Sequence, residues 1–151
     1  MRQQCATLIL RGFIVKLTIE SAVERGKGRL PELFGLEFTR IEQGSAEARV
    51  EIRPEFLAPN GYLHAATIIA LADTCAGYGT VASLPDGAES FTTIELKSNF
   101  LATTRQGAIA CVASLSHSGR TTQVWDADVS EEGTNRKLAI FRCTQIIIYP
   151  S

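Results

Sequence analysis

One segment, from His64 to Leu84, constrains the fold of this chain more than any other feature. Its twenty-one residues carry a single charge, at Asp73, and are otherwise mostly small or aliphatic. A helix on a protein surface has a polar face, so a helix that is apolar on all sides has to be wrapped by other elements. Small residues along it allow a sheet to approach closely; they are Ala65, Ala66, Ala70, Ala72, Ala76, Gly77 and Gly79.

Segments of alternating apolar and polar residues lie on both sides of this helix. The clearest runs from Ala46 to Ile52, where every second residue is apolar, a period typical of a half-buried strand. Glycine-containing turns join the last three segments as hairpins. The predicted strands cover residues 36–41, 45–53, 91–101, 108–116, 121–130 and 137–149. Two strands, one buried helix and an antiparallel meander predict an α+β domain.

The first 28 residues are predicted to form an N-terminal helical segment, separate from a domain over residues 29–151. The glycines at 26 and 28 mark the break between them. The apolar run at residues 5–10 is interrupted by Arg11, so it does not read as a secretory signal. No uninterrupted apolar run reaches the ~18 residues of a membrane span. We therefore expect a soluble, cytoplasmic protein without a membrane segment.

Charge and cysteine content narrow the function classes. The chain has 15 basic and 16 acidic residues, so nothing indicates a surface built to bind nucleic acid or an anionic membrane. Its four cysteines form no CxxC pair and it has only two histidines, so neither a metal site nor a cofactor is expected. We expect reduced cysteines, buried in apolar segments at three positions: Cys75, Cys111 and Cys143.

Two motifs carry a resemblance to a known family. Residues 60–66 read Asn-Gly-Tyr-Leu-His-Ala-Ala, and residues 70–74 read Ala-Leu-Ala-Asp-Thr. Together they resemble the Asn/Gly…His-Gly-Gly…Leu-Ala-Asp signature of hotdog-fold acyl-CoA thioesterases of the phenylacetate-degradation type, with 4-hydroxybenzoyl-CoA thioesterases as more distant relatives. The resemblance covers residues 30–149. It implies an antiparallel sheet wrapped around one long helix, an acyl-CoA substrate, and a homo-oligomer, dimer or tetramer, with interfacial active sites.

The resemblance also implies roles for individual residues. Asp73 matches the helix carboxylate that acts as nucleophile or general base, and Ala65 matches the helix-start amide that polarises the thioester carbonyl. Thr93 matches a polar residue that helps to position water. Arg120 falls where basic residues can meet the CoA phosphates.

The chain departs from the signature in the loop and at the helix start. The Gly-Gly of the family is Ala65-Ala66 here. The two added methyl groups leave less space for the substrate to approach the backbone. A position that is often polar in relatives is Ala58, so Asn60 would have to supply any amide needed there. Gly61 and Ala66 are expected to contact the substrate.

The chemistry of these residues leaves alternatives open. A lone carboxylate in an apolar helix costs several kcal/mol unless it is paired or hydrated, so Asp73 is either solvated by its neighbours or faces a wet crevice as a base. His64 either hydrogen-bonds the loop at the helix start or transfers a proton. Glu95 is either a second carboxylate or a solvated strand residue. Tyr78 and Trp125 either line an acyl pocket or pack in the core.

Three functions fit these features to different degrees. The main interpretation is a thioesterase that hydrolyses an acyl- or aryl-acyl-CoA to the free acid and CoA. The alternative is a non-catalytic acyl-thioester binding protein on the same fold. A hydratase would need an Asp/His pair a few residues apart, and no histidine closely follows Asp73. The strand at 91–101 is predicted to pack its apolar face on the helix and to present Thr93 and Glu95 on the other face, towards an oligomer interface or the active site.

Overall fold

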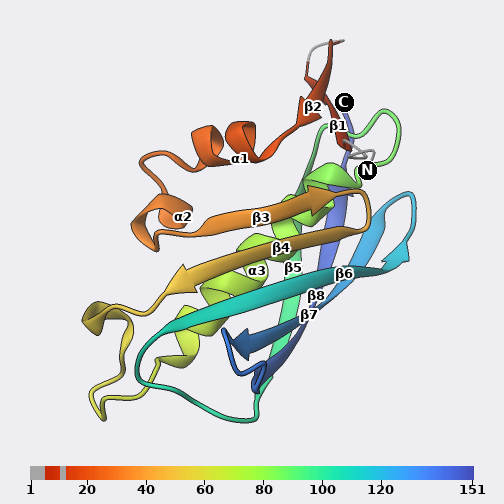
Figure 1. Cartoon of the computed structure of the whole chain (residues 1–151). Coiled ribbons are helices and arrows are strands. Elements are labelled where there is room, and N and C mark those ends of the chain that lie inside the picture. Colours follow the sequence, from red (N-terminus) through yellow and green to blue (C-terminus); the bar gives the residue numbers. More distant parts are fainter. Residues whose placement is uncertain (1–5, 11–12) are drawn as a thin grey trace.

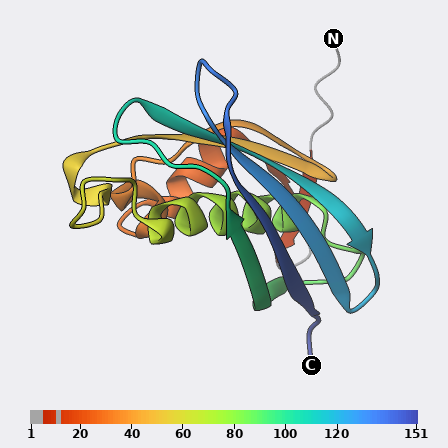
Figure 2. The same ribbon diagram turned by 90° about the horizontal axis from the view of Figure 1, so that it is seen from below.

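A six-stranded antiparallel sheet curves around one long helix (Figures 1 and 2). The computed structural model describes residues 6–10 and 13–151. The strand order is β3-β4-β6-β7-β8-β5, so β5 lies at one edge of the sheet although it follows the helix directly in sequence. The strands are β3 (Glu37–Glu42), β4 (Ser45–Glu51), β5 (Ser90–Phe100), β6 (Ala108–Ser118), β7 (Thr122–Glu131) and β8 (Lys137–Ile148), and the helix is α3 (Ala65–Ala82). This architecture confirms the predicted α+β fold.

The central helix α3 has defined residues at both ends. His64 is its N-cap, and its Nδ1 accepts a hydrogen bond from the amide of Ala66 at 3.0 Å. Ser83 is the C-cap, so the helix is slightly shorter than predicted. By length and hydropathy alone α3 could cross a bilayer, but 56% of that stretch is buried inside the molecule. It is therefore the core helix of this fold, as its lack of a polar face predicts.

Close packing between α3 and β7 depends on a glycine. A Cβ added at Gly79 would lie 2.6 Å from two ring atoms of Trp125, which is 0% exposed. The ring is held in place because its Nε1 donates to Gln123 Oε1 at 3.0 Å, and Gln123 Nε2 donates to the carbonyl of Ser83 at 2.7 Å. Trp125 is thus a core residue, and the small residues of the helix permit the approach that the sequence predicts.

Strand β5 departs from the predicted alternation at one point. Thr93 is paired with Gln145 and Glu95 with Thr144, so Ile94 is an extra residue in a β-bulge. Because side chains alternate between faces, an extra residue reverses the facing of the strand residues after it. Thr93 therefore lies on the helix side of the sheet and Glu95 on the opposite side. The predicted grouping of these two residues on one face is wrong.

The N-terminal segment packs against the domain. It contains a two-stranded antiparallel hairpin of β1 (Ala6–Leu10) and β2 (Phe13–Leu17), followed by the short helix α1 (Ile19–Gly26). A second short helix, α2 (Leu30–Leu33), comes directly after the segment. Among the described residues of the segment predicted to be helical over 1–28, the only helix is α1, and the hairpin precedes it. Leu17 and Ala22 are buried, and the hydroxyl of Tyr78 on α3 donates to the carbonyl of Ala22 at 3.1 Å. The division of the chain after residue 28 stays a prediction.

Three cysteines lie in the core as predicted. Cys75, Cys111 and Cys143 are buried and free, and the thiol of Cys75 donates to the carbonyl of Ala46 at 3.2 Å. Cys5 lies outside the described residues. In the part of the chain that the structure describes, no group of three or more His, Cys, Asp or Glu side chains could hold a metal ion.

Replacing Gly79 with alanine is expected to lower the free energy of unfolding by about 1–3 kcal/mol, because the new methyl overlaps a Trp125 ring that cannot move aside. Gly77→Ala is the matched control on the same helix. Its Cβ would meet only the far edge of the half-buried Phe91 ring, at 3.2 Å. Alanine also favours the helical backbone over glycine by about 1 kcal/mol, so this variant should lose less stability. Chemical denaturation measures both variants, and equal losses would contradict this packing argument.

Candidate active site

Asp73 is the only acidic residue of α3 and lies partly buried on the side of the helix that faces β5. Thr93 Oγ1 donates to Asp73 Oδ1 at 3.4 Å, across the gap between helix and strand. Burial raises the pKa of Asp73, and the hydrogen bond from Thr93 acts in the opposite direction. The arrangement is a carboxylate with increased basicity and one weak hydrogen bond, which suits a base or nucleophile.

A cleft of about 500 Å³ opens beside this carboxylate. Its walls come from α3, from the first residues of β5 and from the N-terminal segment. The lining residues are Arg25, Pro31, Asp73, Thr74, Gly77, Tyr78, Val81, Phe91, Thr92 and Thr93. Of the two aromatic residues that could line an acyl pocket or pack in the core, Tyr78 lines the cleft. Trp125 packs in the core instead. The cleft is large enough for a small acyl group.

The start of α3 presents a second chemical feature. His64 Nδ1 accepts the amide hydrogen of Ala66, so this nitrogen is unprotonated and the neutral ring carries its hydrogen on Nε2. The amide of Ala65 has no acceptor among the described residues. An unpaired amide at a helix N-terminus carries a partial positive charge. It can therefore donate to an oxygen that becomes negative during a reaction.

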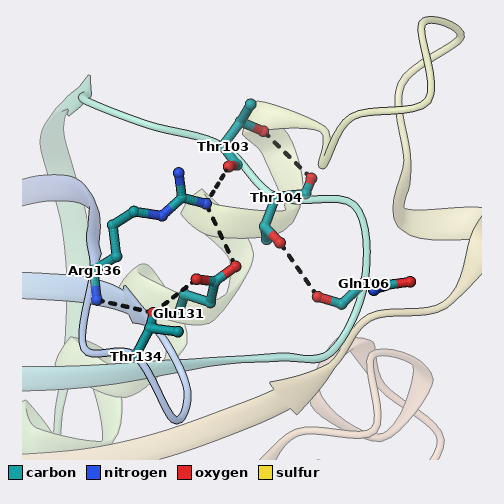
Figure 3. A network of polar contacts seen from close by, with 6 residues as sticks. All are labelled: Thr103, Thr104, Gln106, Glu131, Thr134 and Arg136. Carbon is teal, nitrogen blue, oxygen red and sulfur yellow. Dashed lines mark hydrogen bonds and ion pairs between the residues drawn. The ribbon is translucent and has the colours of Figure 1, made fainter.

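A polar network holds the backbone just before this helix (Figure 3). The amide of Leu63 donates to the carbonyl of Thr104 at 2.9 Å, in the loop between β5 and β6. Arg136 fixes that loop, because its Nη2 donates to the carbonyl of Thr103 at 2.7 Å and to Glu131 Oε1 at 3.4 Å. The turn between β7 and β8 thus supports the start of α3 through two successive contacts.

The loop that leads into the helix uses its own side chains locally. Asn60 Oδ1 accepts a hydrogen bond from the amide of Tyr62 at 3.1 Å, and Gly61 between them has a φ of 79°. This φ lies in the left-handed region that favours glycine. The guanidinium of Arg105 lies 4.1 Å from the centroid of the Tyr62 ring. The side-chain oxygen Oδ1 of Asn60 therefore stabilises the turn and does not point towards the cleft.

Within one chain, the amide of Ala65 and the carboxylate of Asp73 lie too far apart to act on the same carbonyl group. Asp73 lies eight residues after Ala65 on α3, which places them about 12 Å apart along the helix. Reacting atoms approach to about 3–3.5 Å. The amide of Ala65 therefore cannot hold a carbonyl that the Asp73 carboxylate of the same chain attacks.

Two further candidates lie away from the cleft. Arg120 lies in the turn between β6 and β7, where its carbonyl accepts from the hydroxyl of Tyr149 at 2.6 Å and its guanidinium is 5.8 Å from that ring. This turn is at the C-terminal end of α3, opposite the helix start. Glu95 is exposed on the outer face of the sheet, because of the bulge in β5. Neither residue lines the cleft beside Asp73.

The sequence patterns do not reveal two residues of the cleft. Arg25 comes from a segment set apart from the domain by its weak patterning, and only the packing of α1 brings it to α3. In the sequence, Phe91 has the pattern of an ordinary apolar strand residue. Its ring approaches α3 only because position 77 is a glycine.

Known proteins resemble this chain both in sequence and in fold. The thioesterase superfamily matches residues 60–137, which include the helix start, Asp73 and Thr93. The chain is 34% identical to a 1,4-dihydroxy-2-naphthoyl-CoA hydrolase of Listeria monocytogenes, over 76% of this chain and 92% of the relative. A solved mutant thioesterase from Pseudomonas aeruginosa is 25% identical and superposes with a TM-score of 0.82, covering 87% of this chain and 94% of that one.

A third similarity concerns the fold. The PaaI protein of the Escherichia coli phenylacetic acid degradation operon is 19% identical and has a TM-score of 0.77, over 88% of this chain and 93% of that one. These matches confirm the resemblance to hotdog-fold thioesterases that the sequence motifs indicate.

Asp73→Asn is expected to stabilise the protein near neutral pH. The pKa of Asp73 is raised in the folded chain, so between the ordinary value of about 3.9 and the raised value the folded state binds more protons than the unfolded state. The stability of the wild type therefore falls as pH rises through this window. Between pH 4 and pH 8, the melting temperature of the variant minus that of the wild type should increase as the pH rises.

Thr93→Val provides the complementary control. It removes the hydrogen bond that lowers the pKa of Asp73, so carboxyl carbon NMR should show this pKa rising further. A stability difference between Asp73→Asn and the wild type that is independent of pH would show that Asp73 is ordinarily solvated.

Proposed function

Since the chain belongs to the thioesterase superfamily, a family of thioester hydrolases, we propose that it hydrolyses acyl-CoA thioesters to the free acid and CoA with Asp73 as the catalytic carboxylate. The observation that carries this proposal is the partly buried Asp73 in the wall of a cleft, with increased basicity and Thr93 as its one hydrogen-bond donor. Activation of a nucleophile next to a thioester carbonyl needs such a group.

In the proposed reaction Asp73 acts as general base on a water molecule or as the nucleophile itself. In the first case it takes a proton as the water oxygen bonds to the carbonyl carbon, and the proton passes to the sulfur as the carbon–sulfur bond breaks. The amide of Ala65 stabilises the negative carbonyl oxygen, an interaction that can contribute about 3 kcal/mol. Thr93 is placed to orient either the carboxylate or the water.

We propose further that the site is shared between two copies of the chain. The separation of about 12 Å between Ala65 and Asp73 along one helix requires that the two groups acting on one carbonyl come from different subunits. Strand β5 supplies a suitable contact, because it is the sheet edge and exposes apolar side chains, with Leu96 40% and Phe100 45% exposed. Exposed apolar edge strands pair readily with another strand.

A dimer and a tetramer both fit this arrangement. Antiparallel pairing of β5 with its copy would continue the sheet and bury the exposed side chains beside α3. The outer face of β8 exposes a second apolar group that could join two dimers, namely Ile140, Ile146 and Ile148.

The remaining candidate residues have supporting roles in this proposal. His64 positions the helix start through its hydrogen bond to Ala66 rather than transferring a proton. Gly61 and Ala66 shape the surface that receives the thioester, and Asn60 holds the turn before it. Arg120 is assigned to the CoA phosphates of a site completed by another subunit, since it is remote from the Asp73 of its own chain. The free buried cysteines support a location in the reducing cytoplasm.

Asp73→Asn is expected to lose at least about a hundredfold in kcat for an acyl-CoA, because the amide keeps the size of the side chain but removes its basicity. Release of free thiol measures the rate. Asp86→Asn, the same change in the exposed turn after α3, is the matched control and should be fully active. Binding of acyl-CoA without thiol release by the wild type would identify a non-catalytic binding protein instead.

The shared site predicts a dimer or larger assembly by light scattering at micromolar concentration. Leu96→Glu places a charge on the β5 edge and should reduce both the measured mass and the thiol-release activity while circular dichroism stays unchanged. Val112→Glu adds the same charge at an exposed apolar position of the central strand β6 and serves as the control. A fully active monomeric wild type would exclude the shared site.

A further inference from the structure

Arg25 brings a positive charge into the cleft that holds Asp73. It lies in the last turn of α1 and lines the same cleft as Asp73 and Tyr78. Its guanidinium forms no ion pair and no hydrogen bond with any other residue that the structure describes. A guanidinium presents five donors in a planar fork that matches a carboxylate. Arg25 therefore has its full donor capacity available to a ligand in the cleft.

The acidic neighbours of Arg25 are engaged elsewhere. Glu24 forms an ion pair with Lys27. Glu32 Oε2 accepts a hydrogen bond from the amide of Gly28 at 2.7 Å. The positive charge at the cleft is thus not neutralised by an ion pair within this segment.

The walls between Arg25 and Asp73 combine two aromatic rings with threonine side chains. The rings of Tyr78 and Phe91 line the cleft, and the Phe91 ring packs against the backbone of α3 at Gly77. The hydroxyl of Tyr78 is occupied, since it donates to the carbonyl of Ala22. The positive charges of Arg25 and Arg29 both oppose the effect of burial on the pKa of Tyr78, and of these two arginines only Arg25 lines the cleft. Arg25 is therefore the cationic group at this end of the cleft.

The position of Tyr78 along α3 indicates which part of a substrate Arg25 meets. Tyr78, beside Arg25, is five residues beyond Asp73 on α3, a rise of about 7.5 Å. This span suits one aromatic ring with a substituent opposite the thioester, whereas the extended pantetheine arm would carry the CoA phosphates considerably farther from the reacting carbonyl.

We propose that Arg25 binds an anionic group at the far end of the acyl part of the substrate, so that the preferred substrates are CoA thioesters of acids with a second carboxylate, above all aromatic ones. The inference rests on the proposed function, because Asp73 defines the reacting end of the cleft. In this proposal the N-terminal segment selects the acyl group. This segment lies outside residues 60–137, the part of the chain that the family matches.

The test compares 4-carboxybenzoyl-CoA, which carries a carboxylate at the para position, with 4-methylbenzoyl-CoA, which carries an uncharged group there. The wild type should favour the carboxylate by kcat/KM, mainly through KM, by about tenfold or more, the size of one charge-assisted hydrogen bond. Arg25→Gln should abolish most of this ratio. Arg29→Gln is the matched control, because Arg29 is exposed, donates to the carbonyl of Lys27 and does not line the cleft; it should keep the ratio.

Two results would overturn the proposal. The first is a wild type without preference for the carboxylate. The second is an Arg25→Gln variant that loses equally on both CoA esters but not on the matching pantetheine thioesters, since Arg25 would then contact the CoA phosphates.

A binding measurement separates this inference from the proposed function. Calorimetry with monomethyl terephthalate needs no hydrolysis, and the wild type should bind it at least about tenfold more tightly than Arg25→Gln does. Such binding without any thioester hydrolysis would contradict the proposed function and support the anion subsite. Equal binding by both proteins would exclude the subsite, whatever the activity.

Discussion

The wrapping of an almost entirely apolar helix by a single curved sheet is the constraint on which the rest of this structure depends. The helix α3 cannot stay in water, because nearly all its side chains are apolar or small, and the sheet can enclose it only if the two backbones approach closely. Gly79 against the immobilised ring of Trp125 is the point where this approach is tightest. The helix is covered over most of its length, and a cleft remains open beside Asp73, next to the edge strand β5.

The position of Asp73 follows from that asymmetry. On the covered side of α3 a carboxylate would be costly to bury, and on a fully exposed side it would have ordinary basicity. The side facing β5 lies between these extremes, and the bulge in β5 turns the hydroxyl of Thr93 towards the carboxylate there. Stability and the proposed reactivity are therefore opposed at one residue, because the partial burial that raises the pKa of Asp73 also makes its charged form unfavourable in the folded state.

Several distant segments of the chain converge on the two ends of the same helix. The start of α3 is held by His64 and, through the loop before β6, by Arg136 from the last hairpin (Figure 3). The cleft beside Asp73 is completed by α1, which carries Arg25 and is tied to α3 by the hydroxyl of Tyr78.

The sequence by itself determined the parts of this protein that depend on local periodicity. The apolar helix, the alternating strands and the isolated charge of Asp73 are all properties of neighbouring residues, and the family motifs lie on the same short segments. Tertiary structure decided the rest. The bulge that brings Thr93 to Asp73 exists only relative to the residues of β8 that it pairs with, so alternation along β5 alone misplaced it. The cap formed by His64 depends on a ring orientation, and the place of Arg25 in the cleft depends on the packing of α1 against α3. These contacts join residues far apart in the chain, and their geometry is fixed only when the core is packed.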